Sequence, residues 1–165
     1  MTANPETHPS ETQARRLENV HEQLTTALHQ PEVAQRLRAT PGENEWSAMQ
    51  VMGHMAEMIP YWLNQCQRLI AATVETPHFG RTLEAPERLA GVERGTTGEL
   101  DKLLSQLKDE IQGAANTIRH MSAVERSKTG LHLRRGVMTV AEVIEVFIVS
   151  HAEEHLKQVQ ETLRV

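Results

Sequence analysis

The chain has 165 residues, one cysteine and a mildly acidic balance of 17 Lys and Arg against 22 Asp and Glu. This length is typical of one domain with a sizeable hydrophobic core, and a single cysteine excludes an internal disulfide framework. The sequence has no basic cluster beyond Arg134-Arg135. Nucleic-acid binding as the main task is therefore disfavoured, because it needs a concentrated positive surface.

The N-terminal stretch, residues 1–9, is polar and lacks the basic and apolar regions of a secretory signal. The longest β-branched and aromatic run, residues 146–149, is too short to cross a bilayer. We therefore expect a disordered tail over residues 1–9, a single domain over residues 10–165, no membrane association and a cytoplasmic location. The unpaired Cys66 fits a reducing compartment.

Four segments carry apolar residues at a helical period, which predicts four amphipathic helices. They cover about 10–30, 47–69, 96–121 and 139–163. Each begins with Ser or Thr followed three residues later by Gln or Glu, the pattern of a capping box. These pairs are Ser10-x-x-Gln13, Ser47-x-x-Gln50, Thr96-x-x-Glu99 and Thr139-x-x-Glu142.

The connections over about 73–95 and 122–138 are rich in Pro, Gly and polar residues and are predicted as loops, the first with a helical turn at 87–89. No segment alternates convincingly with a period of two, so no strand is expected. The predicted fold class is therefore all-α, a four-helix bundle.

Two histidines in the fourth helix, His151 and His155, are four residues apart. They lie about 40° apart around a helix, so their side chains point the same way. Both fall on the apolar stripe that includes Ile144 and Ile148, where an unpaired polar group costs roughly 1–3 kcal/mol. Either they are core histidines hydrogen-bonded to carbonyls or water, or they share a metal ion.

A third inward-facing histidine, His54, lies on the flank of the apolar face of the second helix. His21 of the first helix is a reserve candidate because it also falls near an apolar face. His120 lies opposite the apolar stripe of its helix and should be solvated. The remaining histidines are expected at the surface: His8, His29, His78 and His132.

The depth of these histidines along their helices predicts the topology. His54 lies about 10 Å from the start of the second helix. His151 and His155 come level with it best if the second and fourth helices are antiparallel. The long connection over 73–95 can cross the bundle and leave the second and third helices parallel, which predicts an up-down-down-up arrangement.

Three imidazoles with open coordination positions are typical of a catalytic metal. Glu154 lies at the edge of the histidine face and is either a base or a solvated carboxylate. Residues 151–155 also match the inverted zinc-protease pattern H-x-x-E-H, but only ten residues follow His155, so a third ligand must come from upstream.

The chain resembles the DinB/YfiT superfamily. Residues 46–54 (WSAMQVMGH) resemble its W-S-x-x-x-apolar-x-x-H motif, and residues 134–139 precede its H-x-x-x-H motif at His151 and His155. The resemblance implies an up-down-down-up four-helix bundle and frequent homodimers. It also implies a divalent metal, with zinc or nickel expected, on His54, His151 and His155.

The resemblance further implies chemistry with a small molecule, since some relatives transfer low-molecular-weight thiols such as bacillithiol or mycothiol to electrophiles. Our leading hypothesis is a metal-dependent thiol S-transferase in stress response or detoxification. The alternatives are a non-catalytic, stress-induced metal-binding bundle and a metal-dependent hydrolase. Arg134 or Arg135 is either a ligand for a substrate carboxylate or a solvated loop residue. Cys66 is expected to pack in the core.

Overall fold

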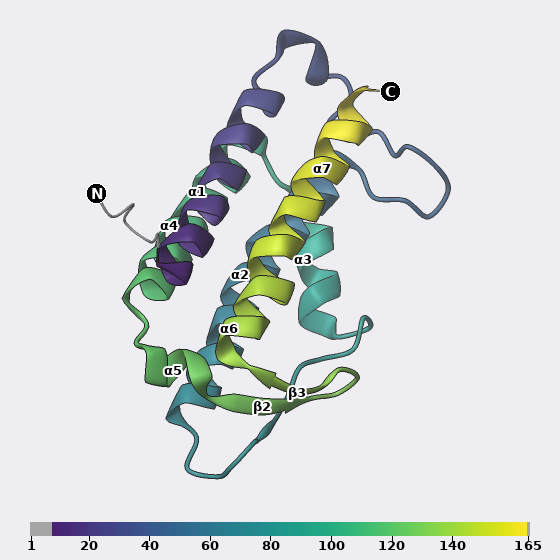
Figure 1. Cartoon of the computed structure of the whole chain (residues 1–165). Coiled ribbons are helices and arrows are strands. Elements are labelled where there is room, and N and C mark those ends of the chain that lie inside the picture. The colour runs from purple at the N-terminus through teal and green to yellow at the C-terminus, as the bar shows by residue number, and fades with distance from the viewer. Residues whose placement is uncertain (1–7, 165) are drawn as a thin grey trace, which may run out of the picture.

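The computed structural model describes residues 8–164, in which four long helical segments lie side by side (Figure 1). The predicted disordered tail lies outside this range except for residues 8 and 9, and the first helix already begins at Pro9. The helical segments are α1 (Pro9–Leu28), α2 (Ala48–Ala71), α4 (Leu100–His120) and a final run made of α6 (Val140–Val143), the π-helix η2 (Ile144–Val149) and α7 (Ser150–Arg164). A short 3-10 helix, η1 (Pro31–Val33), follows α1.

The helix directions follow from contacts near the helix ends. Arg119 at the end of α4 pairs with Glu11 at the start of α1, so these helices are antiparallel. Arg36, which follows α1, donates to the carbonyl of Leu163 near the end of α7, so α1 and α7 run in the same direction. Both α1 and α2 lie against α4 and α7. The bundle is up-down-down-up, which confirms the predicted fold class and topology.

One continuous core joins the four helical segments. Its largest fully buried side chains come from every segment: Leu17 and Leu24 of α1, Met49, Met52, Met55, Met58 and Ile59 of α2, Leu107, Ile111 and Ile118 of α4, and Ile144 and Ile148 of η2. Each such side chain contributes roughly 1.5–3 kcal/mol by leaving water. None of the helices within residues 8–164 is long and apolar enough to cross a membrane.

The connection over 73–95 leads into a full helix, α3 (Pro86–Thr97), where the sequence predicted only a helical turn at 87–89. It packs against α2 through glycines: a Cβ added to Gly95 would lie 2.1 Å from the carbonyl oxygen of Met49, and one added to Gly53 would lie 2.4 Å from that of Gly91. The predicted turn was too short because these glycines provide close helix contact rather than a loop. α3 returns along α2, so α4 can start beside the start of α2.

The loop predicted over 122–138 was also wrong in part. It holds a short helix, α5 (Ala123–Ser127), and a hairpin of β2 (Thr129–His132) and β3 (Gly136–Thr139). β2 also pairs in parallel with β1 (His78–Phe79), which completes a small three-stranded sheet. Strands of two to four residues are too short to show alternation in the sequence.

Two of the four predicted capping boxes form. Ser47 with Gln50 and Thr139 with Glu142 exchange the expected side-chain and backbone hydrogen bonds. The other two predictions were wrong, because α1 begins at Pro9 without a side-chain cap and Thr96 lies inside α3. Proline at the first position of α1 and α3 has no N–H, which removes one of the unpaired N–H groups at each helix start.

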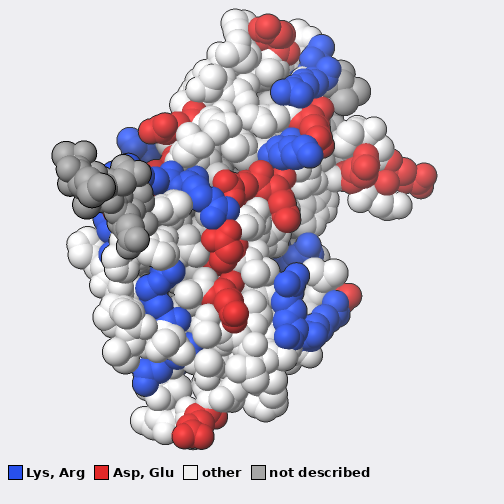
Figure 2. Space-filling view, in the orientation of Figure 1, with Lys and Arg blue, Asp and Glu red and all other residues white. Residues whose placement is uncertain are grey.

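The last helical segment departs from α-geometry just before the histidine pair, in the π-helix η2. Within it, Glu145 accepts a hydrogen bond of 2.9 Å from the Ser150 hydroxyl, five residues on. Glu145 also pairs with Arg16 of α1 at 2.8 Å, and Arg16 binds Glu153 as well. Figure 2 shows acidic side chains running along this last helical segment. Glu145 thus connects the Ser150 hydroxyl to Arg16 of α1.

Candidate metal centre

The structure brings together the three histidines that the sequence predicts as neighbours. His54 comes from the first half of α2, and His151 and His155 come from α7. One ring nitrogen from each lies within 4.8 Å of the other two. The ring centroids are 4.9 Å apart for His54 and His155, and 4.5 Å for His151 and His155. His54 is only 1% exposed.

Two nitrogens of this cluster, Nδ1 of His54 and Nε2 of His155, are buried without a hydrogen-bond partner among the described residues. Such orphaned atoms are rare because each costs roughly 1–3 kcal/mol. On the other side of the His155 ring, Nδ1 lies 2.9 Å from the amide oxygen of Gln158. That oxygen accepts, so Nδ1 carries the proton and Nε2 keeps its lone pair. These residues therefore fit a divalent metal ion.

The three imidazoles are neutral at pH 7. Burial, together with the smaller effects of the neighbouring His155, Arg88 and His151, lowers the pKa of His54 to about 2. Burial likewise lowers the pKa of His151 to about 4 and also lowers the pKa of His155. Since only a neutral imidazole offers a lone pair to a metal, the cluster is held in the binding form.

These pKa shifts predict that the metal-free protein loses stability on acidification. In the unfolded chain a histidine titrates near 6.5, whereas folded His54 resists protonation. The unfolded state therefore binds more protons below pH 6.5, so stability is full above that pH and falls as the pH drops. From pH 7 to 5, His54 alone accounts for roughly 2 kcal/mol.

Urea unfolding at both pH values, with a chelator present, measures this loss. The variant His54→Gln should lose less stability than the wild type over the same interval, by the amount assigned to His54. Equal losses in the two proteins would contradict the assignment.

A pocket of about 320 Å³ opens beside the cluster. His54 and His151 form part of its wall, and the rest comes from Trp62, Arg81, Thr82, Leu83, Arg88, His132, Arg134, Arg135 and Phe147. Trp62 and Phe147 stack with centroids 4.2 Å apart and form an aromatic floor. A molecule in this pocket can therefore reach His54 and His151.

His132 was predicted as a surface residue, and that prediction was wrong. It is 8% exposed and stacks on Phe147 with centroids 4.9 Å apart. The hairpin carries it into the pocket wall, and the hairpin has no clear pattern in the sequence. Two other wall residues, Arg81 and Arg88, were not predicted either. They lie in the connection that contains β1 and α3, which was predicted mainly as a loop.

The other residues considered as site candidates lie in different environments, and only some of them line the pocket. Arg134 and Arg135 line the pocket, whereas Glu154 is exposed and outside its lining. His21 lies in a different groove, between α1 and α4, so it does not join the cluster. Cys66 is fully buried, and burial raises the pKa of its thiol to about 12, which suits core packing rather than a nucleophile.

These features define a four-helix-bundle protein with a three-histidine cluster beside an arginine-lined pocket. A family model described as the DinB superfamily matches residues 11–159, and the chain belongs to this superfamily. No significant match occurs among the curated proteins.

A solved structure with a similar fold is YfiT from Bacillus subtilis, described as a probable metal-dependent hydrolase with an unusual four-helix bundle topology. The two chains are 17% identical and superpose with a TM-score of 0.77, over 99% of this chain and 90% of YfiT. At this identity the likeness establishes a shared fold.

Proposed function

We propose that this protein is an enzyme that binds one divalent metal ion, zinc or nickel, on His54, His151 and His155, and that it transfers a low-molecular-weight thiol to an electrophile. The observation that carries the proposal is the convergence of three neutral imidazoles, two with orphaned nitrogens, at the wall of a pocket. When bound there, the metal would hold the thiol as a thiolate at neutral pH.

Residues of the chain orient the proposed metal ligands and provide a surface for the electrophile. Gln158 fixes the ring of His155 and sets its tautomer. His54 and His151 connect the cluster to the pocket, where Trp62 and Phe147 offer an apolar surface for the electrophile.

Transfer of a thiol suits this pocket better than hydrolysis does. Among the described residues, no carboxylate lines the pocket. Hydrolysis with bound water commonly uses a carboxylate as general base, as in the H-E-x-x-H enzymes. A thiol has a pKa of about 8.5 and loses its proton far more readily than water does. The remaining alternative, a non-catalytic metal-binding bundle, has no need of a pocket beside its ion.

The test starts from the full chain, purified without a nickel column and analysed for bound metal. Bacillithiol or mycothiol is then mixed with monobromobimane, so that the thiolate sulfur forms a thioether, bromide leaves and the proton passes to solvent. We expect acceleration that chelation abolishes and added metal restores. No acceleration with either thiol would refute the transferase. Metal-dependent hydrolysis of an activated ester without thiol transfer would instead favour the hydrolase.

A role in stress response or detoxification, a cytoplasmic location and a homodimeric state remain predictions. Light scattering after size-exclusion chromatography tests the dimer directly.

A further inference from the structure

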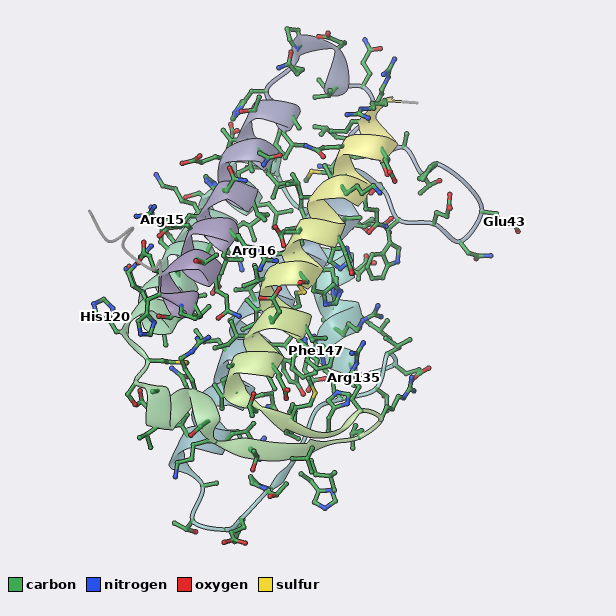
Figure 3. All side chains as sticks on the ribbon, in the orientation of Figure 1. Arg15, Arg16, Glu43, His120, Arg135 and Phe147 are labelled. Atoms are coloured by element: carbon green, nitrogen blue, oxygen red, sulfur yellow. The ribbon has the colours of Figure 1, made fainter. Side chains whose placement is uncertain are left out.

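The pocket beside the histidines is strongly basic although the chain has a net charge of −5. Four of its lining residues are arginines: Arg81 before α3, Arg88 in α3, and Arg134 and Arg135 at the tip of the β2–β3 hairpin. Figure 2 shows Lys and Arg side chains gathered in the region of the hairpin tip and α3. Figure 3 shows Arg135 reaching toward Phe147.

Arg81 is already neutralised, because it forms a buried bidentate pair with Glu57. The other three pocket arginines have no carboxylate partner among the described residues. On the bundle surface, by contrast, Arg16 and Arg119 each bridge two glutamates. Burial is the main cause that lowers the pKa of Arg88; the charge of Arg81 also lowers this pKa, while Glu57 and Glu84 oppose the shift. An anion in the pocket would relieve this excess of positive charge.

The hairpin tip is built around His132. Its Nδ1 accepts hydrogen bonds from the backbone N–H groups of Arg134 and Arg135, each at 3.2 Å. A backbone N–H can only donate, so Nδ1 keeps its lone pair and the neutral ring carries its proton on Nε2. Within residues 8–164, this Nε2–H has no acceptor; its edge of the ring lies beside Gly80, where an added Cβ would come within 3.0 Å of Nε2, and His132 lines the pocket.

Phe147 aligns these donors. The His132 ring stacks on it, and the Arg135 guanidinium carbon lies 5.4 Å from its centroid. Since His151 lies four residues beyond Phe147 and lines the same pocket, the donors and the histidine cluster share one cavity.

We propose that Arg88, Arg134, Arg135 and the Nε2–H of His132 form an oxyanion subsite, which binds a carboxylate or phosphate group of the substrate. Guanidinium groups and an imidazole N–H are donors suited to such oxygens. This proposal depends on the proposed function in one respect: the anionic group belongs to the molecule that reacts at the histidines.

The test is calorimetric titration of the full chain with succinate and, separately, with inorganic phosphate, before and after removal of metal by chelation. We expect one anion to bind per chain in both forms, with succinate tighter for a carboxylate subsite and phosphate tighter for a phosphate subsite. Because the chelated protein is also titrated, failure to bind metal or thiol would leave this result unaffected. Binding only to the metal-loaded form, or no binding, would overturn the subsite.

Matched variants locate the anion. Changing both Arg134 and Arg135 to Gln should weaken anion binding about tenfold or more, the loss expected when charged hydrogen bonds are removed. Arg94→Gln removes a positive charge from an exposed position of α3 outside the pocket lining and should leave the affinity unchanged. An equal effect of Arg94→Gln would overturn the proposal, since binding would then reflect net charge alone.

Nitrogen-15 NMR of His132 provides a readout that is independent of activity. We expect the proton on Nε2 and a shift of that resonance when the anion binds. A proton on Nδ1, or an Nε2 resonance that saturating anion leaves unchanged, would remove His132 from the subsite.

Discussion

Replacing His54 with alanine is expected to lower the affinity for zinc by roughly a thousandfold or more, the largest effect that this account predicts. His54 supplies one of three converging nitrogens, and its Nδ1 has no other partner among the described residues. Two imidazoles four residues apart on one helix remain after the change, and such a pair binds zinc only weakly. Competition with a chromophoric chelator at pH 7 measures the difference.

His120→Ala is the matched control, because it removes an exposed histidine at the end of α4. Figure 3 shows His120 at the side of the bundle away from Phe147. We expect this variant to bind zinc as the wild type does. If His54→Ala kept the wild-type affinity while remaining folded by circular dichroism, the assignment of His54 as a ligand would be wrong.

Gly95→Ala is expected to destabilise the fold by roughly 3 kcal/mol, at the upper end for overpacking. The added methyl group would lie 2.1 Å from the Met49 carbonyl oxygen and 2.8 Å from the Cα of Gln50. Both are backbone atoms, so α3 must move away from α2. Because α3 carries Arg88, the pocket wall would shift as well, and urea unfolding measures the loss of stability.

Gly113→Ala is the control that separates the contact between α3 and α2 at Gly95 from the general effect of replacing a helical glycine. Gly113 lies in the exposed part of α4, and a Cβ there meets nothing within 4 Å. We expect this change to raise the unfolding free energy by up to about 1 kcal/mol through helix propensity. Similar effects of the two substitutions would show that close packing of α3 is not what Gly95 provides.

The arrangement of the histidines could be predicted because it depends on helical phase and depth. Both follow from counting residues along amphipathic helices, and the depth of His54 relative to His151 also selected the topology. The π-helix η2 does not change the angle between His151 and His155, because both residues lie beyond it in regular α-helix. Whether the three rings bind a metal stays a prediction.

The arginine-lined wall could not be predicted, because it depends on contacts between segments far apart in the sequence. Arg88 reaches the pocket only because glycines let α3 lie against α2, and the same glycines indicated a loop. His132 is buried by a hairpin whose strands are too short to show a period. Side-chain packing, rather than local pattern, decides these positions.

The most direct test of the metal centre is an anomalous difference map from crystals of the full chain loaded with zinc. We predict one anomalous peak per chain, bound by ring nitrogens of His54, His151 and His155 at about 2.0–2.1 Å, with an open position toward the arginine-lined pocket. Zinc bound elsewhere, or an occupied site that lacks His54, would contradict the account.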